Sequence, residues 1–581
     1  MSETERARPP VLGSSGRTRD AGVVTLLISL SLLLFFYRLG SLTLFDADEP
    51  AFAESAREML LSGNWVTPQF NFQPRYDKPI LFYWLIGLAY KGFGVGEFAA
   101  RFWSAAFATG LVLSIYLFGR QMLGRRAAVI AALGFATNVG TAILARAAVT
   151  DMTLTFFMTV TLFCFFAVCR APDRIGEGPL FAGYLAMALS VLTKGPIGLL
   201  IPGLVVGLFG VIRGRGWKTI SRLRPVTGLL LFAVVALPWY LLVLRENGWD
   251  FIQGFFLKHH LIRYFGVVSS NSGSPFYFLP VVVLAFFPWT GLLPKAFGDL
   301  WRIRGRLRGE LTGRGELLLF LWLWFGVIFA FFSLSGTKLP SYIFPALPAL
   351  ALLSGAAGEA LLDEGTEAGG MGRAFDWLVG GIACSLSLGL FLLPLFIVDV
   401  RPRIHLGLAP YVLAVLFLLG PALAVYARRK GQGNVTLAAM VATMVLSIVV
   451  AVHRVAPAVQ ERHQKVLRDL ADAAGRQLGP NDLLVAYDLN APSLVFYARR
   501  QVAKVGKCQE ERFRQLAASW DRVLVIARAS AEPRLREVQG IFPLDRRGRY
   551  VLYSSRHGPS DRVGMRGGTR DCRKDTLASP S

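Results

Sequence analysis

Long apolar segments separated by short polar ones recur along most of the chain, from residue 21 to residue 453. An α-helix needs about 20 predominantly apolar residues to cross the hydrocarbon core of a bilayer. Thirteen segments approach or reach that length: 21–39, 102–119, 127–145, 153–169, 180–193, 197–212, 226–244, 276–294, 316–335, 341–357, 377–398, 408–427 and 434–453. The pattern predicts an all-α polytopic membrane protein with about 13 transmembrane helices.

One further apolar run, Ile80 to Tyr90, has only eleven residues before Lys91. This run is too short to span, so we expect a helix lying at the outer interface, anchored by Tyr83, Trp84 and Tyr90. The first apolar run follows twenty polar residues and lacks a clear small-residue cleavage site. We therefore expect it to be a retained span and not a signal peptide.

The composition changes after about residue 455. The sequence VLRDLADAAGRQL has helical periodicity, whereas DLLVAYD and DRVLVIAR are short apolar runs bounded by polar residues. These runs predict a small α/β domain over residues 456–555. Residues 21–455 form the expected membrane domain, with large outer loops at 40–101 and 245–275, and the polar tails 1–20 and 556–581 are expected to be disordered.

Composition and charge agree with this organisation. The 581 residues are 54% hydrophobic and 17% charged, with a formal net charge of +24. The cations lie between spans and do not gather on one soluble face, which argues against nucleic acid. With the N-terminus in the cytoplasm, the inner loops hold twenty Lys and Arg residues and the short outer loops eight. This bias follows the positive-inside rule and places the C-terminal domain outside the membrane.

The five cysteines add little. Cys164, Cys169 and Cys384 lie inside apolar runs, where they are most simply small hydrophobic residues. Cys508 and Cys572 follow the last span, so a disulfide between them is permitted without being supported. The spacing matches no metal-binding cysteine motif.

Ionisable residues gather at the predicted outer ends of the spans. The stretch LFDADEPAFAESAREML, residues 44–60, places three carboxylates where the chain leaves the first span. Others follow in the outer loops: Arg75, Asp77, Lys78, Arg146, Asp151, Lys194, His259, His260, Arg263 and Lys338, with Tyr342. Each of these alone is as readily a solvated anchor at a span end. As a set they favour one external cavity for a substrate that carries a phosphate and an apolar tail.

The same residues carry a family resemblance. The motifs DEPAFAESAREM, YDKPILFYW, EFAARFWSA, ARAAVTDMTL, TKGP, PWY, FFLKHHLIRYF, FPW and TKLPSYIFPALPALAL occur in this order over residues 21 to 360. In that order and spacing they resemble the bacterial lipid-linked glycosyltransferases of the protein O-mannosyltransferase and aminoarabinose (lipid A) transferase superfamily. The resemblance implies a GT-C-type fold and a polyprenyl-phosphate sugar donor used on the outer face, without a nucleotide sugar.

The resemblance also implies the catalytic residues. Asp48 corresponds to the acidic residue that family members need in the first outer loop, Glu49 completes the pair, and Asp151 corresponds to a second outer-loop acid. Asp48 and Glu49 also fit the start of a helix from Pro50 to Leu60, which acidic side chains stabilise. Asp151 has the similar alternative of capping the span that follows it.

Substrate contacts are implied in the same way. Lys78 corresponds to the lysine of the family's KP motif, and Arg263 and Tyr342 correspond to further phosphate ligands. For each the alternative is ordinary anchoring at the interface. The complete expected substrate-binding set is Lys78, Arg263, Tyr342, Lys338, Tyr76 and Arg146.

A divalent metal ion is the open question on cofactors. Some relatives place a carboxylate before KP and a histidine in the second large outer loop, where the two share a metal. Asp77 stands at the first position here, and His259 or His260 at the second. Two ligands are too few to identify a metal, so no cofactor is assigned with certainty.

The expected function is an inverting transfer of a sugar from polyprenyl phosphate to an envelope acceptor, on the outer face of the bacterial inner membrane. The acceptor is a lipid A-type glycolipid or a protein, and the other partners are membrane lipids. A transporter or flippase of a lipid-linked saccharide is the main alternative, although the chain shows no internal repeat and its charges lie at one face. A family member that binds lipid without catalysing transfer is a third reading.

Overall fold

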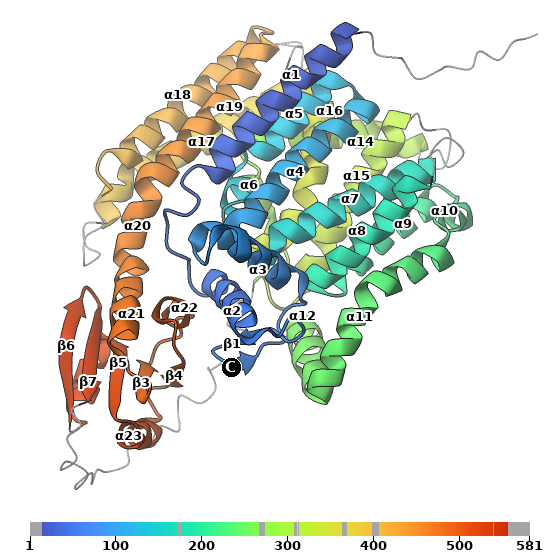
Figure 1. The fold of residues 1–581 in the computed structure, drawn as a ribbon. Coiled ribbons are helices and arrows are strands. Elements are labelled where there is room, and N and C mark those ends of the chain that lie inside the picture. The colour runs from blue at the N-terminus through green and yellow to red at the C-terminus, as the bar shows by residue number, and fades with distance from the viewer. Residues whose placement is uncertain are drawn as a thin grey trace, which may run out of the picture.

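The computed structural model describes residues 14–170, 177–266, 273–306, 311, 313–362, 369–397, 406–538 and 540–555. A large bundle of long helices makes up most of the molecule, and a small sheet-containing domain lies beyond one end of it (Figure 1). The 556–581 tail with Cys572, and residues 1–13 of the N-terminal tail, lie outside the described residues. Their expected disorder and the disulfide therefore stay predictions.

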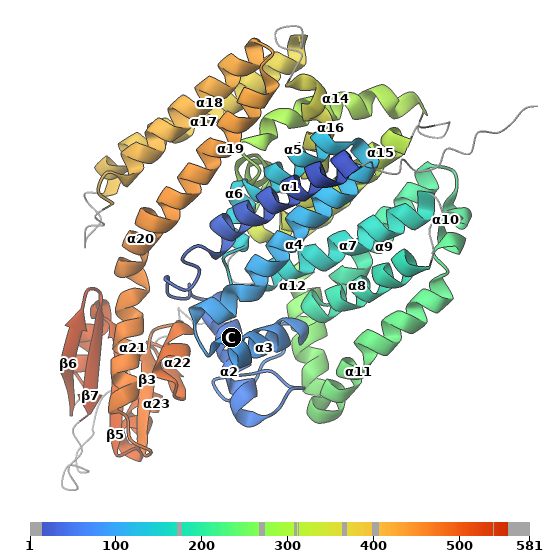
Figure 2. The ribbon, with the colours of Figure 1, turned by 45° about the horizontal axis from the view of Figure 1, so that its top comes forward.

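The first half of the chain supplies the helices around the first loop and one side of the bundle. These are α1 (Ser14–Ser31) with a π-helical turn (Leu32–Phe36), α2 (Asp48–Ser62), α3 (Leu81–Phe93), α4 (Glu97–Leu123), α5 (Arg125–Ala136), α6 (Val139–Leu144), α7 (Thr150–Arg170), α8 (Gly178–Lys194), α9 (Ile197–Ile212), α10 (Gly216–Arg222), α11 (Pro225–Phe251), the π-helical segment η3 (Ile252–Ile262) and α12 (Arg263–Phe265). Seen in two orientations, α8, α9 and α11 lie together on the side away from the sheet domain (Figures 1 and 2).

The second half closes the bundle and leads out of it. Its helices are α13 (Phe278–Ala285), the 3₁₀ turn η4 (Trp289–Leu292), α14 (Leu293–Ile303), η5 (Arg304–Arg306), α15 (Gly313–Leu334), the 3₁₀ segment η6 (Pro340–Ala346), α16 (Leu347–Leu361), α17 (Gly369–Ile397), α18 (Ala409–Arg429), α19 (Gly433–Val450) and η8 (Ala451–Val455). In both views α17, α18 and α19 pack along the opposite side of the bundle, beside α1 (Figures 1 and 2).

The predicted helical membrane fold is confirmed. All thirteen apolar segments fall on helices, and among the described residues eight helices are long and apolar enough to cross a membrane. A ninth is reached if the bent pair formed by α13 and by Trp289–Ile303 is one span. Shorter apolar helices such as α8 and α9, of 17 and 16 residues, fall below that length. The exact count of thirteen spans is therefore not decided by length and composition.

Two predicted spans are not straight helices. The segment 276–294 turns by 107° between α13 and the helix after it, at Pro288, whose ring removes a backbone donor and stops a helix. The segment 127–145 is divided between α5 and α6 at Asn138. The Asn138 side chain accepts a hydrogen bond of 2.8 Å from Thr141 N and so caps the start of α6.

The first large loop contains two short helices and a hairpin. Helix α2 ends at Gly63, which has the positive φ of 70° common at helix C-termini. The two-residue strands β1 (Gln69–Phe70) and β2 (Gln73–Pro74) follow, paired antiparallel, and then α3. The expected role of Tyr83 and Tyr90 as interfacial anchors is wrong, because both are buried inside the protein, 0% and 3% exposed. Helix α3 packs against α2 and α4 instead of lying free at a lipid surface.

The C-terminal part forms the α/β unit that its apolar runs predict. Helices α20 (Ala456–His463) and α21 (Lys465–Gln477) lead into a sheet of order β4-β3-β5-β7-β6. The strands are β3 (Asp482–Tyr487), β4 (Val502–Val505), β5 (Arg522–Arg528), β6 (Ile541–Arg547) and β7 (Tyr550–Ser555); β3 pairs in parallel with β4 and β5, and β7 runs antiparallel to β5 and β6.

Both faces of this sheet are covered. Helices α21 and α22 (Ser493–Ala498) pack their apolar side chains on one face, and α23 (Glu510–Ser519) and α24 (Glu532–Arg536) pack theirs on the other. Central strands buried on both faces carry continuous apolar runs, as in LLVAY of β3 and VLVIA of β5. We refer to residues 456–555 as the C-terminal unit.

Candidate active site

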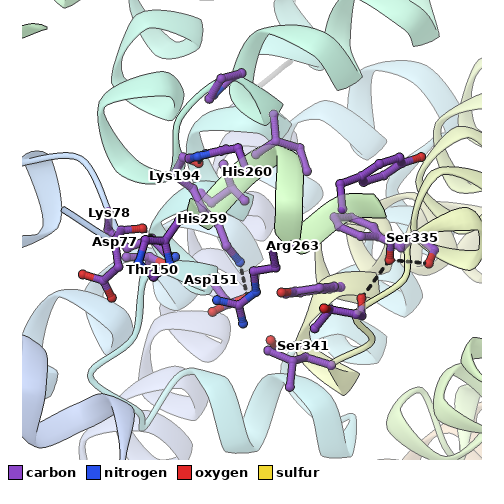
Figure 3. Close-up of a pocket in the computed structure, with 18 of the residues that line it drawn as sticks. Asp77, Lys78, Thr150, Asp151, Lys194, His259, His260, Arg263, Ser335 and Ser341 are labelled. Atoms are coloured by element: carbon purple, nitrogen blue, oxygen red, sulfur yellow. Dashed lines mark hydrogen bonds and ion pairs between the residues drawn. The ribbon is translucent and has the colours of Figure 1, made fainter. Parts of the chain in front are cut away.

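A cavity of about 530 Å³ lies between the first loop and the helical bundle. Its polar lining comes from six segments that are distant in sequence, and Figure 3 shows Lys78, Asp151, Lys194 and Arg263 among the side chains around it. The contributing residues are Asp48 of α2, Asp77 and Lys78 before α3, Thr150 and Asp151 of α7, Lys194 of α8, His259, His260 and Arg263 of η3 and α12, and Ser335, Thr337, Ser341 and Tyr342 around the start of η6. Apolar side chains including Phe52, Leu154, Leu200, Phe256 and Phe332 complete the wall.

Asp48 is the first residue of α2, and its side chain is exposed to the cavity. The N-cap position itself belongs to Ala47, which makes no side-chain capping bond. Asp48 thus lies in the first helical turn, where the helix dipole favours a carboxylate. Among the described residues its carboxylate has no ion-pair partner. It is therefore free to meet a bound group.

Glu49 points away from the cavity, although it is the next residue. Consecutive helical residues differ by about 100° in direction, and Glu49 is 5% exposed. Its oxygens accept bonds of 2.8 and 2.7 Å from the Arg101 guanidinium, 2.8 Å from Phe45 N and 2.7 Å from Ala148 N. The sequence-based pairing of Glu49 with Asp48 as catalytic acids does not match this placement, which makes Glu49 a structural ion-pair partner.

Lys78 presents an ammonium group to the cavity beside an already neutralised carboxylate. Asp77 accepts bonds from Arg75 Nε at 2.6 Å and from Nη2 at 2.7 Å. Burial raises the pKa of Asp77, but the charge and hydrogen bonds of Arg75 outweigh burial and hold that pKa well below its usual range. Burial lowers the pKa of Lys78 to about 8; Asp77 opposes this, while the nearby cations Arg263 and Lys194 add to it.

Lys194 is held across the cavity by two partners. Its Nζ donates a bond of 2.8 Å to Asp151 Oδ1 and lies 5.4 Å from the centre of the Tyr342 ring. The Tyr342 ring in turn packs on Phe332, with centroids 4.9 Å apart. Asp151, expected to be catalytic, lines the cavity and is 6% exposed, and its visible task is to hold Lys194.

Arg263 lies where η3 passes into α12, and its side chain lines the cavity (Figure 3). Its Nε is buried and has no hydrogen-bond partner among the described residues. A buried donor without a partner costs free energy of about 1–3 kcal/mol unless a ligand supplies an acceptor. A phosphate oxygen is well suited, because guanidinium and phosphate match in charge and geometry.

Three of the expected substrate contacts lie elsewhere. Arg146 donates to the carbonyls of Leu34, Phe35 and Tyr37, at the end of the first helical segment. Lys338 Nζ donates to the carbonyls of Ser333 and Ser335, at the end of α15. Both cations thus satisfy carbonyls left open at helix C-termini, and neither lines the cavity.

Tyr76 is the third. Its hydroxyl donates a bond of 2.9 Å to Asn247 Oδ1, and its ring packs edge-on against Phe251. It does not line the cavity. The side chain instead ties the first loop to the end of α11.

Two of the three expected metal ligands, Asp77 and His260, already bind protein groups. Asp77 uses both oxygens on Arg75, and His260 is bound through Nδ1 to the Phe255 carbonyl at 2.6 Å. In the described parts of the chain no group of three or more His, Cys, Asp or Glu side chains is placed to hold an ion. Of the three expected ligands, His259 alone lines the cavity without an ion pair or hydrogen bond of this kind to another described residue. We therefore derive no step through a metal.

Sequence reasoning gave no individual role to three functional or supporting residues. Lys194 and Arg75 were expected only as members of the set of ionisable residues at the outer span ends. Arg101, in the EFAARFW motif, donates to Glu49 and to the carbonyls of Leu39, Leu42 and Thr43. Nothing in the local sequence indicates that one arginine organises the whole approach to α2.

Comparison with known proteins identifies relatives of the chain. The family model for dolichyl-phosphate-mannose-protein mannosyltransferase matches residues 23–247. The chain is 34% identical over 336 residues to undecaprenyl phosphate-α-4-amino-4-deoxy-L-arabinose arabinosyl transferase 2 of Pseudomonas fluorescens, covering 57% of this chain and 58% of that protein. A protein of Aquifex aeolicus is 31% identical over 334 residues, which are 57% of this chain and 72% of that protein.

The fold has a counterpart among solved structures. The crystal structure of ArnT from Cupriavidus metallidurans bound to undecaprenyl phosphate superposes with a TM-score of 0.78 and 27% identity, over 94% of this chain and 100% of that one. The sequence matches to the first three curated relatives extend over only 58–63% of their lengths. The relatives that carry a functional name are transferases, which favours sugar transfer over the transport alternative.

Proposed function

We propose that this chain, which belongs to the lipid-linked glycosyltransferase superfamily of the protein O-mannosyltransferases and aminoarabinose transferases, is itself such an enzyme. It moves a sugar from a polyprenyl-phosphate carrier to an envelope acceptor. The observation that carries the proposal is the cavity that Lys78, Lys194 and Arg263 line together with Asp48 and apolar side chains.

The cations bind the carrier phosphate. Arg263 offers a buried donor without a partner, and Lys78 and Lys194 add charge close to it. The apolar part of the wall suits a polyprenyl chain, because burying apolar surface is favourable. As the reaction proceeds, negative charge grows on the leaving phosphate, and cations already in place stabilise that charge in a poorly solvated site.

The transfer inverts the anomeric carbon. An acceptor oxygen attacks that carbon as the bond to the phosphate oxygen breaks, and the bonding electrons leave with polyprenyl phosphate. When the acceptor is a hydroxyl, Asp48 takes its proton. When the acceptor is itself a phosphate, as on a lipid A-type glycolipid, no proton has to be removed and Asp48 orients the nucleophile. Asp151 contributes by positioning Lys194.

The substrates to try first follow from the relatives. Their names specify undecaprenyl phosphate as carrier and 4-amino-4-deoxy-L-arabinose as sugar, which favours a lipid A-type acceptor over a protein. We place the enzyme in the bacterial inner membrane with thirteen spans, the N-terminus in the cytoplasm, and the cavity and C-terminal unit outside. The positive-inside bias supports this orientation.

Transfer from purified undecaprenyl-phosphate sugar to a lipid A-type acceptor, followed by mass spectrometry of the product, tests the proposal. Asp48→Asn and Lys78→Ala are expected to lower turnover by about 100-fold or more. Asp472→Asn, in an exposed ion pair of α21, and Lys91→Ala, on α3, are matched controls expected to keep normal turnover. Full turnover of both site variants would refute the proposed mechanism.

A further inference from the structure

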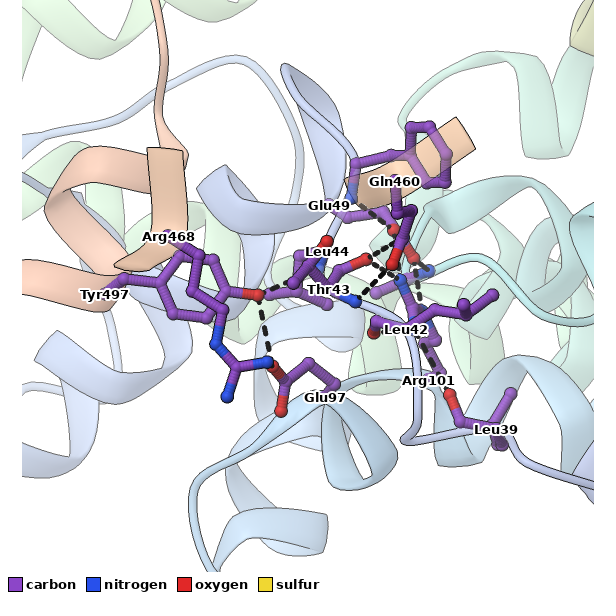
Figure 4. A network of polar contacts seen from close by, with 12 residues as sticks. Leu39, Leu42, Thr43, Leu44, Glu49, Glu97, Arg101, Gln460, Arg468 and Tyr497 are labelled. Atoms are coloured by element: carbon purple, nitrogen blue, oxygen red, sulfur yellow. Dashed lines mark hydrogen bonds and ion pairs between the residues drawn. The ribbon is translucent and has the colours of Figure 1, made fainter. Parts of the chain in front are cut away.

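The backbone that leads into Asp48 is held by hydrogen bonds to residues far along the chain (Figure 4). Three consecutive amides each donate to a different side chain. Thr43 N donates to Gln460 Oε1 at 2.8 Å, Leu44 N to the Tyr497 hydroxyl at 2.9 Å, and Phe45 N to Glu49 Oε2 at 2.8 Å. Two of the three acceptors therefore belong to the C-terminal unit.

The opposite side of the same segment is bound by the membrane domain. The Arg101 guanidinium of α4 donates to the carbonyls of Leu39, Leu42 and Thr43 at 3.1, 2.7 and 2.8 Å. Arg101 thus binds three carbonyl groups of the segment, while the C-terminal unit accepts from two of its amides, those of Thr43 and Leu44. The segment from Leu39 to Phe45 consequently has little freedom, although it forms no helix or strand.

Gln460 and Tyr497 are themselves held in place. Gln460 of α20 is 4% exposed, and its Nε2 also donates to Thr43 O at 2.7 Å, so its amide pairs with both backbone groups of one residue. The Tyr497 hydroxyl of α22 donates to Glu97 Oε1 at 3.1 Å, and the Arg468 guanidinium pairs with Glu97 at 3.3 Å over the Tyr497 ring. These contacts orient both acceptors (Figure 4).

The C-terminal unit forms hydrogen bonds with the first loop at two further residues, Asp46 and Asn71. Asp46 accepts bonds from Ser493 N at 2.8 Å and from Ser493 Oγ at 2.5 Å. In the hairpin, Asn71 exchanges two bonds with the backbone of Val502, at 2.9 and 2.8 Å. Asp46 lies two residues before Asp48, and Asn71 lies seven residues before Lys78. The backbone that carries Asp48 and Lys78 into the cavity is therefore hydrogen-bonded to the C-terminal unit.

We propose that the C-terminal unit is a positioning element for the cavity, in which Gln460 and Tyr497 fix the backbone that aims Asp48 at the bound acceptor. The inference rests on the proposed glycosyl transfer, and it assigns the unit a task in that reaction. Neither residue touches the cavity, so both act through Thr43 and Leu44.

A small displacement of the Asp48 carboxylate would be enough to slow the reaction. Reacting groups must be held to within a fraction of an ångström, and a misplacement of 1 Å can cost about 100-fold in rate. Loss of the Tyr497 hydroxyl or of the Gln460 amide would leave Leu44 N or Thr43 N without its acceptor. The segment would then sample other conformations, while Lys194, Arg263 and Tyr342, which belong to other elements, would stay in place.

Tyr497→Phe and Gln460→Leu test the inference in the full-length protein. Turnover is expected to fall about tenfold or more, while the Kd for undecaprenyl phosphate changes less than about twofold, because the residues that bind phosphate are untouched. Hydrogen–deuterium exchange of residues 39–48 is expected to be faster than in wild type. Tyr487→Phe in β3 and Gln515→Leu in α23 are the matched controls and should behave as wild type in all three measurements.

Other results would overturn the inference. Turnover within about twofold of wild type in both variants would show that positioning by the C-terminal unit is not needed for the reaction. A parallel loss of carrier affinity and exchange protection throughout the molecule would reduce both residues to a general structural role. Failure of the proposed function would give a different result from failure of this inference. The wild type would then be inactive in the transfer assay, while hydrogen–deuterium exchange at residues 39–48 would still distinguish the variants from their controls.

Discussion

Arg75 binds both carboxylate oxygens of Asp77, with Nε 2.6 Å from Oδ1 and Nη2 2.7 Å from Oδ2. The pair lies directly beside Lys78, the residue proposed to hold the carrier phosphate. Because Arg75 neutralises Asp77, the charge of Lys78 is left for a ligand. Arg75 thus keeps Asp77 from competing for Lys78, although Arg75 does not itself line the cavity.

Removing Arg75 should turn Asp77 from a neutralised group into a competitor for Lys78. We expect Arg75→Gln to raise the Kd for undecaprenyl phosphate about tenfold, since breaking one side of a buried ion pair leaves an uncompensated charge. The double variant Arg75→Gln/Asp77→Asn should recover most of that affinity. Equilibrium binding in detergent micelles measures both, and a double variant no better than the single one would contradict this account.

Carrier affinity should depend on pH through Lys78. Its pKa of about 8 means that the ammonium loses its proton as pH rises through 8, so cationic binding is present below that pH and lost above it. The carrier phosphate, with a second pKa of about 6, is already fully ionised in this range. The Kd should rise by up to about tenfold per unit above pH 8, and Lys78→Arg should abolish this dependence. A Kd that is flat from pH 7.5 to 9.5 in wild type would count against it.

Substitution of the adjacent carboxylates Glu49 and Asp48 should affect stability and activity differently. Glu49→Gln removes one side of the buried pair with Arg101, and we expect it to lower the free energy of unfolding by about 3 kcal/mol. Asp48→Asn, at an exposed position, should change that free energy by less than about 0.5 kcal/mol and yet abolish turnover. Chemical unfolding in detergent and the transfer assay give the two readouts. A Glu49→Gln protein that is as stable as wild type but inactive would instead show that Glu49 acts in the reaction and not in stability.

Turnover should not require a metal ion. Asp77 and His260 are bound within the protein, and the described residues offer no set of three ligands. Prolonged treatment with EDTA followed by gel filtration is expected to leave turnover within about twofold of the untreated enzyme, because two ligands rarely hold a divalent ion. Loss of turnover that added Zn²⁺ or Mn²⁺ restores would contradict this and direct attention to His259.

The orientation of the C-terminal unit can be tested with Cys508, which is exposed. In a Cys572→Ser background, a membrane-impermeant maleimide added to intact spheroplasts should label Cys508, because the proposed thirteen spans, an odd number, would place the unit outside. Cys508→Ser is the control and should abolish labelling. Labelling that appears only after the membrane is permeabilised would reverse the topology.

The helical membrane fold, the α/β unit and the family could be predicted from the sequence, which also singled out Asp48, Lys78, Arg263 and Tyr342 as residues that the structure places in one cavity. Such features are encoded locally, because hydrophobic periodicity and short motifs are properties of neighbouring residues. Their common location at span ends allowed the cavity itself to be expected.

The partner of each polar side chain could not be predicted, because it depends on how distant segments fold together. Glu49 and Asp48 are neighbours with the same chemistry, but a rotation of about 100° along the helix sends one to Arg101 and the other to the cavity. Lys338 and Arg146 resemble phosphate ligands in sequence, and they satisfy helix-end carbonyls instead. Gln460 lies 417 residues from Thr43, and no local pattern records a hydrogen bond between segments that only folding brings together.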